Sequence, residues 1–246
     1  MSRVAETIEI NFSRAIPVFP LPGCVLLPHG SLPLHVFEPR YLRMIGDVID
    51  SSGLLAMGLF RKKLTQEEYL HGRPAIRSHV CVGYVEQYKP LEDGRYLLLL
   101  RGLCRAQVID EEPHEPYRLF HLRPTDLEAT DDPSLKGQRR RIESLLNDPS
   151  LRGVEGVEEL IGLLDKRVPT TALIDIVAMQ LCDDAEQRYP LLAESRAQRR
   201  GDALTEQLLR LRDRIGSVGS RNPTVGFSSM RTLTPTVAIL TMAAPT

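Results

Sequence analysis

The sequence contains no tryptophan, and aromatic residues make up only 5% of its 246 residues. No stretch approaches the roughly 18 consecutive apolar residues that a membrane-spanning helix needs. The segment MSRVAETIEINFSR, with which the sequence begins, includes acidic residues and lacks the apolar core of a secretory signal peptide. These absences argue against helical membrane spans and favour a cytoplasmic protein.

Cysteine is also scarce. The four cysteines, Cys24, Cys81, Cys104 and Cys182, lie far apart and form no C-x-x-C pair, which argues against a zinc site and favours free thiols. The first three lie in apolar segments, where thiols stay protonated, so we expect no nucleophile among them. His35 has no second His or Cys at ligand spacing, so we expect a packed, hydrogen-bonded histidine and no metal or cofactor.

An excess of either charge is absent too, because the formal net charge is only −1. A near-neutral chain has no overall attraction to nucleic acids or acidic membranes. The basic run 136–141, KGQRRR, is the local exception, and it could contact RNA. No aromatic residues interleave the run, so a solvated helix face is the favoured interpretation, and RNA binding remains the alternative function.

Proline, by contrast, is abundant in one apolar segment. Six prolines lie between positions 17 and 39, and Ile, Val, Leu and Phe lie between them. Proline lacks a backbone donor and is confined to the ends, edges and bulges of strands. The segment therefore predicts short strands that turn sharply at the prolines, as in a small bent barrel. The prolines are Pro17, Pro20, Pro22, Pro28, Pro33 and Pro39.

The hydrophobic period changes near Pro124. We expect a β-rich domain over 1–124, with one helix that opens at Pro39, and a helical domain over 125–215. The segment 61–74 is expected to be a loop, and 216–246 a tail without regular structure. The expected strands are 16–19, 24–27, 32–37, 54–60, 80–88, 95–108 and 117–123, and the later helices 133–146, 154–164, 171–181, 185–192 and 196–215.

The opening segment resembles the Lon N-terminal domain, the substrate-binding region at the front of Lon-type ATP-dependent proteases. The resemblance covers about residues 14 to 213 and is carried by F-P-L-P-G at 19–23 and F-E-P-R-Y at 37–41, with weaker matches at 82–83, 93–96 and 100–102. It implies an α+β fold, a PUA-like β pseudobarrel followed by a helical subdomain. The motif residues that it implies to be structural are Pro20, Pro22, Phe37, Glu38, Pro39, Arg40 and Tyr41.

The resemblance also implies which parts of a full Lon protease are missing. Gly53 and Gly58 have the spacing of a Walker A loop, but Leu59 and Phe60 follow them, so no lysine can reach a phosphate. The Ser-Lys dyad of Lon proteases lies outside the matching region. We therefore expect no enzyme, but a binding module that captures exposed apolar or unfolded polypeptide segments, in one scenario as an adaptor for a protease in trans.

A peptide-binding surface in this chain has to be built from residues other than tryptophan. Aromatic residues of the β-rich half, together with neighbouring leucines, are the expected candidates. Glu38 and Arg40 are interpreted as structural, through a helix N-terminus and an ion pair, and a hydrolase is the weakest alternative. The candidate peptide-binding residues are Phe60, Tyr69, Tyr84, Tyr88, Tyr117 and Phe120.

Overall fold

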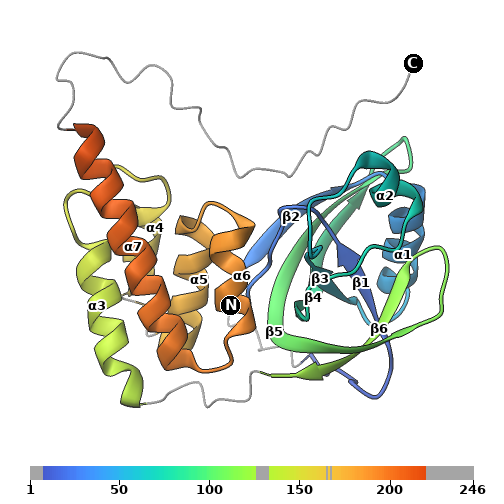
Figure 1. Cartoon of the computed structure of the whole chain (residues 1–246), viewed down its shortest axis with the longest axis horizontal. Helices are drawn as coiled ribbons and strands as arrows, with labels where there is room; N and C mark the ends of the chain where they lie inside the picture. The colour runs from blue at the N-terminus through green and yellow to red at the C-terminus, as the bar shows by residue number, and fades with distance from the viewer. Residues whose placement is uncertain (1–7, 126–132, 165, 167, 220–246) are drawn as a thin grey trace, which may run out of the picture.

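The described strands lie in the first half of the chain together with two helices, the second half is helical, and the two halves lie side by side (Figure 1). The computed structural model describes residues 8–125, 133–164, 166 and 168–219. The strands are β1 (Ile16–Pro20), β2 (Ser31–Val36), β3 (Leu54–Gly58), β4 (His79–Pro90), β5 (Tyr96–Glu112) and β6 (Arg118–Pro124). The helices are α1 (Pro39–Ile49), α2 (Gln66–His71), η1 (Pro133–Leu135), α3 (Lys136–Leu146), α4 (Val157–Leu164), α5 (Thr170–Leu181), α6 (Ala185–Ala193) and α7 (Ala197–Gly219).

All six strands belong to one sheet, in the order β2-β5-β4-β3-β1-β6. The 17-residue strand β5 pairs with β4 along one side, and along its other side it pairs first with β2 and then with β6. The pairing of β5 with β6 closes the sheet on itself and leaves β2 outside the closed circuit. In the described residues the ladder partner of β2 is β5, so one edge of β2 stays free.

The phase of the β2–β5 ladder explains how a proline fits into β2. The N–H of Gly102 donates to the carbonyl oxygen of Gly30 at 2.8 Å, and the register then continues without a shift along β2. Because an antiparallel strand directs its backbone groups alternately to either side, Ser31, Pro33 and His35 direct theirs to the free edge. Pro33 therefore removes no hydrogen bond from the ladder, as expected for proline in an edge strand.

The expected strand 24–27 is wrong, because these residues form an irregular loop. Their side chains are nevertheless buried, with Leu26 and Leu27 fully inaccessible. Each of the five strands in the closed circuit already has a neighbour on both sides, so none of these strands leaves an edge open to this segment. Gly23, with a positive φ of 67°, starts the loop by turning the chain after β1 in a conformation that favours glycine.

Two other expectations about helices need correction. The segment 61–74 contains α2, which begins with a capping box in which Thr65 and Glu68 satisfy each other's backbone N–H groups. A helix of six residues is too short to show a hydrophobic period. Helix α7 continues to Gly219 instead of ending at 215, and the rest of the expected tail lies outside the described residues. No helix in the part of the chain that the structure describes has the length and apolar character of a membrane span.

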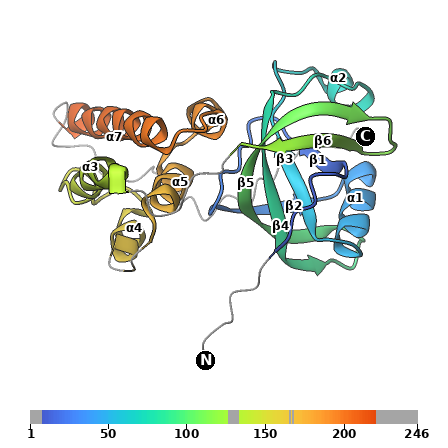
Figure 2. The same ribbon diagram turned by 90° about the horizontal axis from the view of Figure 1, so that it is seen from below.

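A buried ion pair joins the two halves. Arg105 of β5 forms a two-pronged pair with Asp175 of α5, and both side chains are at most 1% exposed. The Nε of Arg105 also donates to the carbonyl oxygen of Leu191 in α6 at 3.2 Å. Nearby, the His79 N–H donates to the hydroxyl of Tyr189. Figure 2 accordingly shows α5 and α6 as the helices next to the strands.

Candidate functional site

The F-E-P-R-Y segment builds a polar cluster where α1 meets α2. Arg40 forms an ion pair with Glu38 at 2.9 Å and donates to the carbonyl oxygen of Tyr69. The hydroxyl of Tyr69 donates to the other carboxylate oxygen of Glu38 at 2.5 Å. Burial raises the pKa of Tyr41 to about 12 and also raises the pKa of Tyr69, so both phenols stay protonated at neutral pH.

The cluster confirms the expected ion pair but not the expected cap. Glu38 occupies the N-cap position of α1, yet its side chain makes no capping hydrogen bond there. The carboxylate turns instead to Arg40 and Tyr69, which tie α1 to α2 across the loop. The contacts of Glu38 and Arg40 therefore hold the start of α1 against α2.

Replacing Glu38 by Ala is expected to lower the free energy of unfolding by about 1–3 kcal/mol, because Arg40 and Tyr69 both lose their acceptor. Urea unfolding of the purified variant measures the change. Tyr69→Phe, which removes one of these hydrogen bonds and keeps the ring, should cost less. Unchanged stability together with lost binding of polypeptide would show that Glu38 belongs to a binding site.

The structure does not gather the six candidate aromatic residues into one surface. Phe60, Tyr69, Tyr117 and Phe120 are at most 7% exposed and belong to the core. Tyr84 is half-buried, with its ring against Gly53. Of the six, Tyr88 in β4 is the one with a largely accessible ring, 52% exposed.

Exposed apolar side chains gather instead on the outer side of β2 and β5. The strand register sets His35 opposite Leu97 and Pro33 opposite Leu99, so these four share one side of the sheet. Phe37 follows β2 on the same side, with its ring centroid 5.8 Å from that of His35. Leu97 is 38% and Phe37 37% exposed. We call this surface the β2–β5 face and define it by Pro33, His35, Phe37, Leu97 and Leu99.

Polar groups border the β2–β5 face. Gln87 and Lys89 of β4, both exposed, lie opposite Leu99 and Leu97 on the far side of β5. On the opposite side, away from β5, the face ends at the free edge of β2, to which Ser31 and His35 direct their backbone N–H and C=O groups. The half-buried His35 was expected to be hydrogen-bonded, but its Nε2 is buried and makes no hydrogen bond within the described residues. An apolar surface next to unpaired backbone groups can bind an extended chain.

Burial keeps three of the four cysteine thiols protonated. Burial raises the pKa of Cys24 to about 11 and that of Cys182 to about 12, and it also raises the pKa of Cys81. The Cys24 and Cys81 thiols therefore stay protonated at neutral pH, as expected, and so does the Cys182 thiol; Cys24 lies in a loop and not in a strand. The side chains in the described ranges include no group of three metal-ligating residues that could hold an ion.

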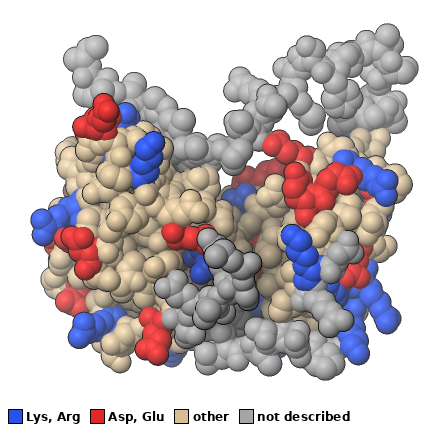
Figure 3. Space-filling model, turned by 180° about the vertical axis from the view of Figure 1, so that it is seen from behind, with Lys and Arg blue, Asp and Glu red and all other residues tan. Residues whose placement is uncertain are grey.

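The basic run forms the start of α3, and part of its charge is already paired. Arg139 forms an ion pair with Glu143 at 2.7 Å and donates to the carbonyl oxygen of Val168. Arg141 pairs with Asp202 of α7. On the face seen in Figure 3, basic and acidic side chains both occur, without one continuous basic field. The run therefore offers less free charge to RNA than its sequence suggests.

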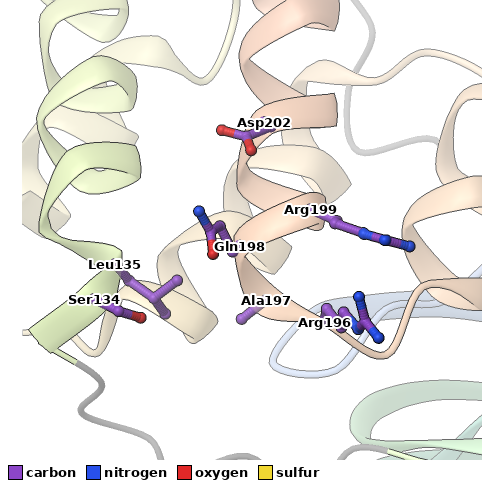
Figure 4. Close-up of a pocket in the computed structure, with 7 residues that line it drawn as sticks. All are labelled: Ser134, Leu135, Arg196, Ala197, Gln198, Arg199 and Asp202. Atoms are coloured by element: carbon purple, nitrogen blue, oxygen red, sulfur yellow. The ribbon is translucent and has the colours of Figure 1, made fainter.

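A pocket of about 510 Å³ lies between the start of α3 and the first turns of α7 (Figure 4). Two of its three charged side chains, those of Asp202 and Arg199, already have partners. Asp202 accepts hydrogen bonds from Gln138 and Arg141, and Arg199 lies 3.6 Å from a carboxylate oxygen of Glu194. This arrangement provides neither a nucleophile with an adjacent base nor an apolar surface, so the pocket is a weaker candidate than the β2–β5 face. The residues that line it are Ser134, Leu135, Arg196, Ala197, Gln198, Arg199 and Asp202.

Three comparisons with known proteins agree with this architecture. A family model described as the ATP-dependent protease La (LON) substrate-binding domain matches residues 15–210. A Lon N-terminal domain protein from Xanthomonas campestris has a similar structure, with a TM-score of 0.55, 24% identity and coverage of 80% of this chain and 97% of that one. The N-terminal domain of Mycobacterium avium complex Lon protease gives a TM-score of 0.61, 19% identity and coverage of 79% and 98%.

The matching region forms only a small part of a full-length Lon protease. Lon protease 1 of Myxococcus xanthus is 24% identical over 170 residues, which are 67% of this chain but only 19% of that protein. At this level of identity the solved structures establish the fold, whereas the family model spans most of the chain. The protein belongs to the family of Lon substrate-binding domains.

Proposed function

We propose that this protein captures exposed apolar segments of unfolded polypeptides on its β2–β5 face. The observation that carries the proposal is the exposure of Phe37 and Leu97 beside the free edge of β2. Membership of a family of substrate-binding domains supports it. The closed sheet also agrees with the PUA-like pseudobarrel that the sequence resemblance implies.

Binding would combine apolar contact with backbone pairing. Side chains of the captured segment would cover Phe37, Leu97 and Leu99, and its backbone would meet the free groups of Ser31 and His35. Burial of two or three apolar side chains gains about 4–8 kcal/mol. Ordering of the captured segment subtracts from this gain, so we expect an affinity in the micromolar range or weaker.

We further propose that the protein is not itself a catalyst. Its sequence contains no G-x-x-x-x-G-K-[ST] loop for ATP, and burial keeps the Cys24, Cys81 and Cys182 thiols protonated. Bound segments would then be delivered to a protease in trans. The relationship to Lon protease 1, of which the matching region forms about a fifth, supports this context. The purified protein is expected to hydrolyse neither ATP nor casein.

The binding preference can be tested by fluorescence anisotropy with two probes, a labelled unfolded peptide rich in Phe and Leu and a labelled single-stranded RNA. Apolar contacts predict peptide affinity that is nearly flat between about 50 and 200 mM salt, whereas release of counterions from several phosphates predicts a steep decrease. Tight, salt-sensitive binding of RNA without binding of the peptide would contradict the proposal and favour the alternative function.

The location of the site can be tested with two matched substitutions. Leu97→Asp places a charge in the centre of the β2–β5 face and is expected to weaken peptide binding at least tenfold. Ile109→Asp is the control, because Ile109 is 55% exposed and lies in the bulge where β5 pairs with β6, far from β2. Equal loss of binding in the two variants, with both folded, would place the site elsewhere.

A further inference from the structure

The sequence after α7 contains a segment with the properties of a ligand for the β2–β5 face. Residues 236–242 read TVAILTM, and no charged residue follows Arg231 in the printed sequence. β-branched and aliphatic residues favour an extended strand, and alternation places Val237 and Ile239 on one side and Leu240 and Met242 on the other. Such a strand could cover apolar side chains and pair with a free edge at the same time.

The chain is long enough to bring this segment to β2. Helix α7 has 23 residues, so its end lies about 35 Å from its beginning. Figure 1 shows that α7 starts close to the β half and runs away from it, so a linker that returns to this half has to cover about the length of the helix. The 16 residues 220–235 can span up to about 53 Å when extended. The connection therefore permits binding within one molecule.

We propose that residues 236–242 bind the β2–β5 face of their own chain, as an added strand along the free edge of β2. The segment then competes with the polypeptides that the face captures, a consequence that rests on the proposed function. The donors and acceptors for the added strand are the backbone groups of Ser31 and His35 and the carbonyl oxygen of Pro33. Its side chains would cover Phe37 and Leu97, which are exposed in the described part of the chain.

The effective concentration of the tethered segment determines how strongly residues 236–242 lower the affinity of the face for another polypeptide. A linker of this length gives an effective concentration of about 1 mM. If the free segment binds with a Kd of about 0.1 mM, as a short apolar peptide would, the face is occupied about nine-tenths of the time. The apparent affinity for another polypeptide is then lowered by about tenfold.

The test compares three full-length proteins: wild type, Ile239→Asp with Leu240→Asp, and a control with Met230→Asp and Thr232→Asp. The control adds the same two charges outside the segment. Anisotropy with the labelled unfolded peptide is expected to show about tenfold tighter binding by the first variant than by wild type and the control. Equal affinity of all three proteins for the peptide would overturn the competition.

Amide hydrogen exchange tests the docking without any added ligand. The amides of Ser31 and His35 face the free edge, so they are expected to exchange about tenfold faster in the Ile239→Asp, Leu240→Asp variant than in wild type and the control. Equal exchange in the three proteins would overturn the docking. Protection that grows with protein concentration would assign the segment to a second copy and overturn binding within one chain. A difference in exchange without any peptide binding would uphold docking and contradict the proposed function.

Discussion

Replacement of Arg105 by Met is expected to lower the free energy of unfolding by about 3–5 kcal/mol, because Asp175 is left as an unpaired buried charge. Both side chains are at most 1% exposed, so water cannot replace the lost partner. The substitution also removes the hydrogen bond from Nε to Leu191 in α6. Urea unfolding followed by circular dichroism measures the loss.

The double variant Arg105→Met, Asp175→Leu separates the loss of the pair from the penalty of an unpaired charge. Apolar residues of similar size often replace a buried ion pair without loss, so this variant should be within about 1 kcal/mol of wild type or more stable. A single variant that unfolds like wild type would show that the pair does not hold the two halves together. A double variant as unstable as the single would assign the cost to lost packing.

Replacement of Gly102 by Ala is expected to destabilise the protein by about 3 kcal/mol, the upper end of the usual cost of overpacking. A Cβ atom at this position would lie inside the van der Waals contact distance of the Leu27 carbonyl oxygen and 3.1 Å from the Sγ of Cys81. The obstructing oxygen belongs to the backbone, so a change of rotamer cannot relieve the clash. Gly102 also exchanges hydrogen bonds with His29 and Gly30, and a shift of either chain would disturb the start of β2.

Gly46→Ala is the matched control for this substitution. Gly46 lies inside α1, and nothing lies within 4 Å of the position that its Cβ would take. Alanine should therefore stabilise the protein by about 0.5–1 kcal/mol through its helix propensity. Thermal unfolding of both variants should shift the melting temperature in opposite directions. Equal small shifts would show that the loop at Leu27 moves freely away from β5.

Most of the regular structure could be predicted from local sequence patterns. The helix that opens at Pro39 and the strands expected at 80–88 and 95–108 depend on residues close together in the chain, and they occur about where they were expected. Asp93-Gly94, with a positive φ at Gly94, turns the chain between the two strands. The loop 24–27 was predicted as a strand because its residues are apolar. Whether an apolar segment pairs depends on the edges that distant strands leave open, and local sequence does not contain that information.

The candidate site was harder to predict, because aromatic character does not determine exposure. Tyr69 lies within the short helix α2 and Tyr117 just before β6, and both are buried and hydrogen-bonded, Tyr69 to Glu38 and Tyr117 to Asp47. Leu97 and Leu99 were not singled out. A signal for them was present in the run of four leucines at 97–100, since a strand that is apolar on both sides must either be covered or expose one side.

The position of Pro33 has a consequence for how long a captured chain stays bound. Since Pro33 has no N–H, the free edge of β2 offers a donor at Ser31 and another at His35, with a gap between them. A partner strand is then held by few backbone hydrogen bonds. Since differences in affinity between related complexes lie mainly in the dissociation rate, we expect this loss to shorten the time for which the partner stays bound. The edge therefore favours rapid turnover of cargo, which suits a protein that passes its ligand to another molecule.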